Sequence, residues 1–364
     1  MATALGGSTL DRAPARPGAG AGSRRAVRAW LYLLAALVLA MVAVGGATRL
    51  TGSGLSITEW KPVTGAVPPL TGAGWEGEFA KYRASSQYQN LNRGMALEEF
   101  KTIYWWEWSH RQLGRLIGLV FALPLLVFWW RGALSGRRAV ALLGIGALGG
   151  LQATVGWIMV ASGLEPGMTA VAPLKLMAHL VLASLILGLL VGTAAGMGDA
   201  SPDRRVGRGV RLAAGAFAGL VLLQIALGGL VAGSRAGFTY NTWPLMDGQL
   251  VPPAEALFSV RPWLESFVDS PALVQFNHRF LAYALVAFAL AQAVALRRTA
   301  PGSAAARRAT GLAGLALTQM ALGIVTLLLV VPLWAGLAHQ LLAMGLLAMA
   351  AAHASRCTRE RAPG

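Results

Sequence analysis

The amino-acid sequence predicts an all-α integral membrane protein with eight transmembrane helices, arranged as two pseudo-twofold-related four-helix bundles. Hydrophobic residues make up 55% of the chain and charged residues 13%, whereas ordinary soluble domains contain about 25% charged residues. Several apolar runs reach the roughly 17 to 25 residues that a helix needs to cross a bilayer. The second half of the chain also repeats features of the first, which predicts the division into two bundles.

The predicted helices follow the apolar runs, at residues 29–48, 107–130, 138–160, 173–195, 210–232, 273–295, 309–331 and 334–353. Residues 1–28 are rich in Ala, Gly and Arg and predict a disordered cytoplasmic arm. The remaining predicted domains are an N-terminal half at 29–195, a cytoplasmic linker at 196–209, a C-terminal half at 210–353 and a cytoplasmic tail at 354–364.

The arginines predict how the helices are oriented. They cluster before the first predicted helix, in every second loop after it, and after the last helix. The positive-inside rule therefore places both termini in the cytoplasm. The net charge of +16 is explained by this topology and by contact with anionic membrane lipid, so no nucleic-acid partner is expected.

The N-terminus also has features of a targeting segment. A basic start before an apolar run is typical of a signal peptide, and an arginine-rich, acid-poor arm is typical of a mitochondrial presequence. Because the first run has counterparts later in the chain, we interpret it as a retained helix. The bias toward Ala, Arg and Gly favours a bacterial gene.

Four histidines recur at equivalent points near the start of the even-numbered helices: His110, His179, His278 and His339. Histidine is costly in hydrocarbon, so four in register indicate a shared purpose. Facing imidazoles can bind a haem iron from both sides. We therefore expect two haem sites near the outer surface, one between His110 and His179 and one between His278 and His339, all four being axial ligands.

Two further residues bear on this prediction. His353 has no counterpart in the repeat and is assigned no ligand role. Cys357 is the only cysteine, which excludes an intrachain disulfide, cysteine-ligated clusters and c-type haem attachment.

The odd-numbered helices carry a second repeat, in which a longer side chain precedes a glycine by four residues: Met41 and Gly45, Gln152 and Gly156, Gln224 and Gly228, Gln319 and Gly323. Residues four apart share a helix face. Close helix packing explains such glycines. Alternatively, the glycines leave room for a flat porphyrin whose edge the glutamines line.

The two halves differ beside the histidines. Glu107 stands three residues before His110, whereas Gln275 stands three residues before His278. An acid in one half only suggests catalysis there and electron handling in the other half. The competing interpretation is an ion pair between Glu107 and Arg111.

Three arginines lie near the histidines in the sequence. Arg111, Arg115 and Arg279 could pair with haem propionates, Arg111 and Arg115 in the first half and Arg279 in the second. Extension of their side chains to the lipid headgroups is the alternative.

The outer segments before the second and sixth predicted helices are long, and we expect them to fold as caps over the haem pockets. Trp60 and Trp243 lie in corresponding parts of the two segments. Tryptophans at such positions are also common interfacial anchors.

The segments GGATRLTGSGLSITEWKPVTGAVPPL, EFKTIYWWEWSHRQLGRLIG, YNTWPLMDG and FNHR resemble the haem A synthase family, over essentially the whole chain after the N-terminal arm. The single cysteine is similar to the cysteine-poor subtype of Gram-negative bacteria and mitochondria, so no loop disulfide is expected. The resemblance implies a multi-pass inner-membrane enzyme that oxidises a methyl group of haem O to a formyl group, making haem A for cytochrome oxidase.

The same resemblance implies roles for individual residues. His278 and His339 would bind a haem b cofactor, His110 and His179 the substrate haem, and Glu107 matches the essential glutamate of the family. The hypothesis is that electrons pass through the haem b while the methyl carbon is hydroxylated in successive steps, with Glu107 as base or proton relay. Expected partners are haem O, haem O synthase and cytochrome oxidase assembly factors, and assembly into a homo-oligomer is left open.

The sequence leaves two other functions open. A diheme b-type membrane electron-transfer protein would use the same four histidines, but it would not need Glu107 in one half only. A transporter with parallel repeats would show broken helices with polar residues at the membrane midplane, whereas the polar residues here gather at the outer ends.

Overall fold

The computed structural model describes residues 21–134, 136–198 and 207–358. Eight helices are long and apolar enough to cross a membrane, as predicted: α1 (Ala21–Leu50), α4 (Leu97–Trp130), α5 (Gly136–Gly163), α6 (Pro173–Gly196), α7 (Arg208–Gly233), α10 (Pro271–Thr299), α11 (Ala304–Leu328) and α12 (Leu333–Thr358). Across the described ranges there is no strand, only an isolated bridge between Met246 and Gln249.

Several helices extend beyond the predicted bounds. α1 begins at Ala21 inside the predicted arm, α4 begins ten residues early at Leu97, and α12 continues into the predicted tail to Thr358. The ends of an apolar run mark where a helix leaves the hydrocarbon of the membrane. The helix itself can continue beyond that point, because Arg, Glu and Lys favour helical structure in water. At the start of α4, the Glu99 carboxylate accepts a hydrogen bond from the Ala96 amide (2.8 Å). The rest of the predicted arm, linker and tail, at 1–20, 199–206 and 359–364, lies outside the described residues.

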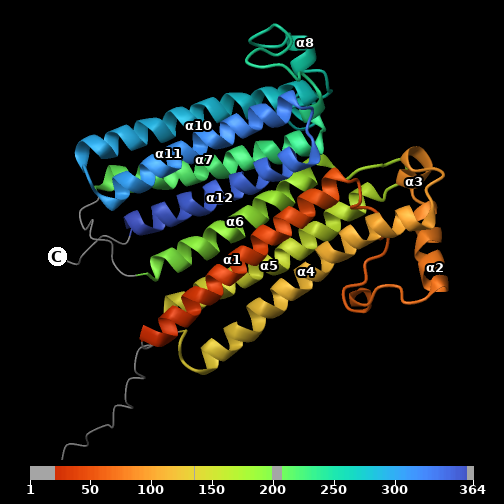
Figure 1. Cartoon of the computed structure of the whole chain (residues 1–364), viewed down its shortest axis with the longest axis horizontal. Helices are drawn as coiled ribbons and strands as arrows, with labels where there is room; N and C mark the ends of the chain where they lie inside the picture. The colour runs from red at the N-terminus through yellow and green to blue at the C-terminus, as the bar shows by residue number, and fades with distance from the viewer. Residues whose placement is uncertain (1–20, 135, 199–206, 359–364) are drawn as a thin grey trace, which may run out of the picture.

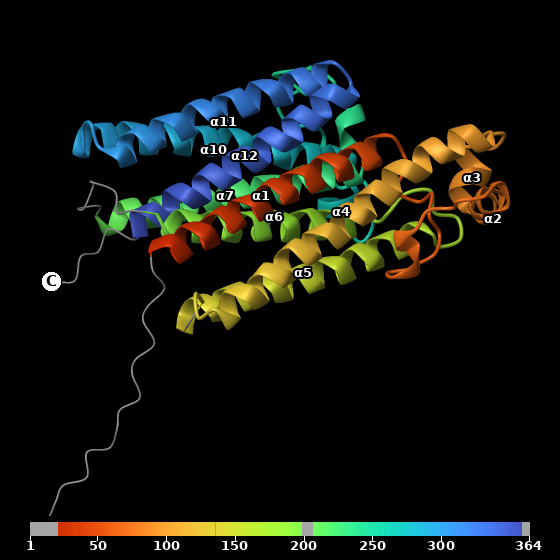
Figure 2. The ribbon, with the colours of Figure 1, turned by 60° about the horizontal axis from the view of Figure 1, so that its bottom comes forward.

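The long helices pack as two groups that share a wide contact (Figures 1 and 2). α1 packs on α4 and α6, and α5 packs on α6, whereas α7, α10, α11 and α12 form a closed ring of contacts. α6 joins the groups by packing against both α7 and α12. The Ser184 hydroxyl of α6 lies 3.4 Å from the Met344 sulfur of α12, and each of these residues follows its helix's histidine by five positions. The pseudo-twofold relation between the groups stays a prediction.

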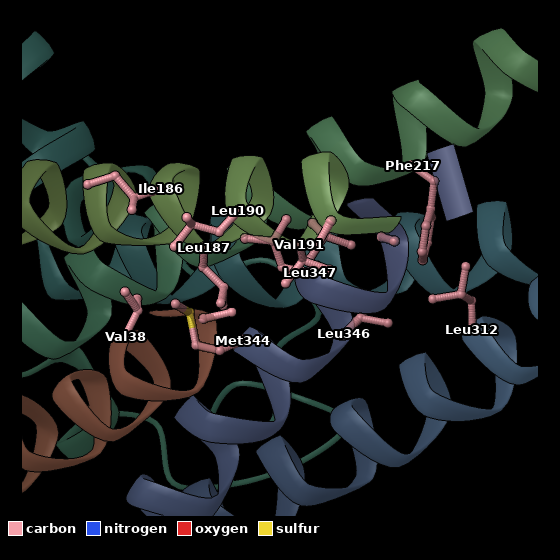
Figure 3. Close-up of a cluster of buried hydrophobic side chains, with 14 of the residues drawn as sticks. Val38, Ile186, Leu187, Leu190, Val191, Phe217, Leu312, Met344, Leu346 and Leu347 are labelled. Atoms are coloured by element: carbon pink, nitrogen blue, oxygen red, sulfur yellow. The ribbon is translucent and has the colours of Figure 1, made fainter. Parts of the chain in front are cut away.

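The central core is apolar and lies where the two groups meet (Figure 3). Leu187 and Leu190 of α6, Phe217 of α7 and Met344 of α12 are at most 2% exposed. In a membrane these contacts stabilise the fold through close packing, because lipid tails are as apolar as the side chains. The core therefore fixes α6 and α12 firmly, and both carry a predicted ligand.

The first group is the more open of the two. In their most apolar stretches, only 6% of α4 and 11% of α5 are buried, against 33% of α10 and 22% of α11. α4 makes few contacts with α5, whereas the corresponding helices α10 and α11 pack extensively. One contact on α4 and α5 is between Phe121 and Gly146, where an added Cβ would lie 2.8 Å from the ring.

The two outer segments lie at the same end of the molecule (Figure 1). The first contains η1 (Thr64–Ala66), α2 (Gly72–Arg83) and α3 (Ser86–Leu91), and the second contains η2 (Ala236–Phe238), α8 (Ala254–Leu257), η3 (Trp263–Glu265) and α9 (Ser266–Asp269). The first segment has a core of its own, in which Tyr82 and Phe100 are fully buried. The expectation that this segment is folded is confirmed.

An ion-pair network ties the start of the first segment to α2. Lys61 and Lys81 both contact the Glu59 carboxylate, at 2.6 and 2.7 Å, and Lys81 also contacts Glu78 at 2.8 Å. Hydrogen bonds from Lys61 and then Lys81 lower the pKa of Glu59 to about 2. The network therefore stabilises the segment at neutral pH, within the limits that solvent exposure sets for surface pairs.

Candidate functional site

Each of the four predicted histidines lies against the predicted glycine of the preceding long helix. An added Cβ would lie 3.0 Å from His110 Nε2 at Gly45, 2.8 Å from His179 Cε1 at Gly156, 3.3 Å from His278 Cε1 at Gly228 and 2.8 Å from His339 Cε1 at Gly323. The glycines thus make room for the imidazole rings, which neither interpretation of the repeat had specified. Both helix packing and ligand placement follow from the same contact.

Glutamine fixes three of the four histidines. Gln152, Gln224 and Gln319 each donate a hydrogen bond from Nε2 to the backbone carbonyl of their histidine, at 3.1, 3.0 and 2.9 Å. The same nitrogen lies 3.1 Å from Nδ1 of His278 and of His339. In all three glutamines the buried Oε1 has no partner among the described residues.

The second pair of histidines has the spacing of a bis-imidazole iron site. The rings of His278 and His339 have centroids 6.4 Å apart and planes at 77°. A metal to imidazole nitrogen bond is about 2 Å, so an iron between two rings leaves about 6 Å between their centres. Gln224 and Gln319 hold these histidines through Nε2 and the histidine carbonyls, and each leaves a buried Oε1 beside the pair that no described protein group satisfies. These residues therefore fit a haem.

The first pair is brought together as well. α1 packs on both α4, which carries His110, and α6, which carries His179, so the two histidines belong to one helix group. His179 has the glutamine contact described above, through Gln152. No side-chain hydrogen bond is found for His110 within the described ranges.

Glu107 lies one helical turn from His110 toward the outer end of α4 and is only 3% exposed. Its Oε2 accepts hydrogen bonds from the Ser56 hydroxyl and the Ile57 amide, both at 2.8 Å. Its Oε1 pairs with Arg111 at 2.7 Å. The ion pair that competed with a catalytic interpretation is therefore present, and it also holds the outer segment on α4.

Gln275 occupies the corresponding place in α10 with the opposite hydrogen-bonding sense. Its Nε2 donates to the carbonyls of Ala236 (2.7 Å) and Thr239, and its Oε1 accepts from Arg279 (2.9 Å). Glu107 accepts from its outer segment, whereas Gln275 donates to its own. The two halves thus differ both in the side chain, Glu107 or Gln275, and in the backbone groups that face it, an amide in the first half and carbonyls in the second.

The three predicted propionate ligands have different surroundings. Arg111 donates to the carbonyls of Ile57 and Glu59, at 2.9 and 3.0 Å, and Arg115 donates to the carbonyls of two further residues of the same outer segment. Arg279 donates to the Tyr240 carbonyl, but its Nε and Nη1 are buried without a partner among the described residues. Arg279 is therefore the arginine of the three with donors left for an anionic group.

Comparison with known proteins identifies the family. A family sequence model described as "Cytochrome oxidase assembly protein" matches residues 28–351. The chain belongs to this family. It is 65% identical to a protein named "Heme A synthase" from Methylobacterium sp. (strain 4-46), over 95% of this chain and 96% of that protein. A protein of the same name from Brucella ovis is 49% identical over 91% of each chain.

The sequence of this cytochrome oxidase assembly protein did not predict which residues bind the Glu107 carboxylate. Ser56 and Ile57 lie about fifty positions earlier, and the only signal was their place in the motif GSGLSITEW. His353, which was assigned no ligand role, is fully buried at the inner end of α12, where its Nδ1 lies 3.3 Å from Arg308. It lies in the opposite part of the helix from His339.

Proposed function

We propose that this protein is a haem A synthase that oxidises a methyl group of haem O to a formyl group, yielding haem A for cytochrome oxidase. The observation that carries the proposal is the pairing of four inward-facing histidines, spaced for iron in the second half, within a chain 65% identical to relatives of that name. The reaction adds one oxygen atom, taken from water, to the methyl carbon and releases electrons and protons; haem b would carry the electrons away to an external electron acceptor.

The second half, residues 210–353, would hold a haem b through His278 and His339. Bound there, haem b would supply one-electron chemistry. Gln224 and Gln319 orient the two rings, and Arg279 offers its two unpartnered donors to a propionate. The surrounding helices of this half are closely packed, which suits a cofactor that stays bound.

The first half, residues 29–195, would bind the substrate haem between His110 and His179. Glu107 is the nearest acid on the His110 helix, and its carboxylate is held in one orientation by three donors. It would accept a proton released as oxygen is added and pass it toward the outer side along the Ser56 hydroxyl. Arg111 holds the other carboxylate oxygen, Oε1, at 2.7 Å.

The arginine distribution supports a bacterial inner-membrane protein with both termini in the cytoplasm and both histidine pairs near the periplasmic side. Haem O is an apolar membrane molecule, so its direct supplier would be haem O synthase in the same bilayer. The product would pass to cytochrome oxidase assembly factors.

The test is a porphyrin analysis of membranes that contain the protein and a source of haem O. Glu107→Gln should leave the low-spin b-type spectrum intact but stop haem A formation, so that haem O accumulates. Glu98→Gln, on the exposed side of the same helix, is the matched control and should behave as the natural protein does. Normal haem A output from Glu107→Gln would refute the role of Glu107. Absence of haem A from the natural protein would favour the diheme electron carrier.

A further inference from the structure

His110 differs from the other three histidines in what holds it. His179, His278 and His339 are each fixed by a glutamine of the preceding helix. At the corresponding place in α1 stands Met41, whose methyl carbon would lie 3.1 Å from a Cβ added at Gly114. A thioether cannot donate a hydrogen bond to the His110 carbonyl.

The ring of His110 also presents a different edge to its glycine. His179 and His339 turn Cε1 and Nδ1 toward Gly156 and Gly323, whereas His110 turns Nε2 and Cδ2 toward Gly45. The His110 ring therefore contacts Gly45 through a different edge, and no glutamine among the described residues orients this ring.

The helix that carries His110 is the least buried of the eight. α4 packs along α1 but makes few contacts with α5, whereas α10 is packed on both sides by α7 and α11. α4 can therefore shift away from α5 at a lower cost in lost packing than α10 can from α11.

We infer that His110 is the releasable iron ligand of this protein, so that the first-half site exchanges its porphyrin while the second-half site retains its own. The inference rests on the proposed function, since exchange is what a substrate and product require and retention is what a cofactor requires. Gln152, Gln224 and Gln319 are positioning residues that hold their histidines in place, and Met41 leaves His110 without such a partner.

The experiment follows loss of porphyrin from the full-length purified protein to an excess of apomyoglobin, with each retained porphyrin identified by mass. In the natural protein, haem O or haem A should leave at least tenfold faster than haem b. Met41→Gln supplies the missing donor and should slow that loss about fivefold, the factor expected for one net hydrogen bond. The same variant should raise the low-spin fraction of the first-half porphyrin.

The second half provides the reverse test. Gln319→Leu should speed the loss of haem b about fivefold. Gln292→Leu is the matched control, because Gln292 is a buried glutamine of α10 in the same half, about 20 Å along the helix from His278. This variant should leave both rates unchanged.

Two results would overturn the inference: equal loss of both porphyrins from the natural protein, or an unchanged rate of haem O loss from Met41→Gln. If Met41→Gln does not fold, Gln152→Leu takes its place and should speed haem O loss from the His179 side, and an unchanged rate there would equally refute the inference. Haem A formation in the same preparations reports separately on the proposed function. Two kinetically distinct haem pools without haem A would uphold the exchange site and reject the synthase.

Discussion

Replacing Gly323 with alanine tests whether the glycines exist to seat the ligand rings. The added Cβ would lie 2.8 Å from Cε1 of His339, with Nδ1 and Nε2 at 3.4 and 3.5 Å. That first distance is shorter than packed carbon atoms tolerate, so the ring or the helix must move. Overpacking of this kind costs about 1 to 3 kcal/mol, which exceeds the gain of up to about 1 kcal/mol from alanine in a helix.

Two other glycines calibrate the effect. At Gly228 the nearest ring atom of His278 would be 3.3 Å away, and at Gly314 of α11 nothing lies within 4 Å. Gly314→Ala should be neutral or stabilising, because only the helix propensity changes there. Gly228→Ala should be close to neutral, since a few tenths of an ångström can be absorbed.

The assay is retention of the low-spin b-type spectrum by the purified variants at rising detergent and temperature. A difference of about 2 kcal/mol between Gly323→Ala and Gly314→Ala corresponds to about a thirtyfold difference in the haem dissociation constant. If Gly323→Ala held haem b as tightly as Gly314→Ala, the packing of Gly323 on His339 would have no part in ligand placement.

Two further predictions concern the outer segments. Because the pKa of Glu59 is lowered to about 2 from 4.5, its stabilisation of the first segment is complete above about pH 4.5 and is lost as the pH falls toward 2. Hydrogen exchange in α2 should therefore rise over that range in the natural protein but not in Glu59→Gln, and a parallel rise in both would contradict this. Gln275→Glu would face a carboxylate toward the carbonyls of Ala236 and Thr239 and should cost about 2 kcal/mol or more in thermal stability. An unchanged melting temperature would show that these bonds do not stabilise the segment.

The membrane helices were predictable because one physical quantity, the length of an apolar run, determines them. Their ends were not, because charged residues such as Glu98 and Glu99 leave the hydrocarbon without ending the helix. The fold of the first outer segment could not be predicted from hydropathy. Its buried aromatic core around Tyr82 depends on contacts between residues that are distant in sequence.

The candidate site was predictable in its residue types but not in its contacts. Their repeated positions in the sequence identified the four histidines. The four-residue spacing identified the glycines that follow Met41 and the three glutamines. The bond from glutamine to the histidine carbonyl involves a backbone atom, which no side-chain pattern reveals. Pairing of Arg111 and Arg115 with propionates was expected because guanidinium groups suit bidentate pairing with carboxylates. The sequence could not show that both arginines also donate to carbonyls of the outer segment.

The opposite hydrogen-bonding sense of Glu107 and Gln275 restricts how the two halves could have diverged after a duplication. An amide in place of Glu107 would turn a donor toward the donors of its outer segment, and a carboxylate in place of Gln275 would turn an acceptor toward carbonyl oxygens. Either exchange is neutral only if the peptide groups of that outer segment have already changed orientation. A tolerated exchange at either position would therefore require a matching change in the outer segment that faces it. This dependence makes the difference between Glu107 and Gln275 hard to reverse by one substitution, even though both halves carry two histidines at matching positions.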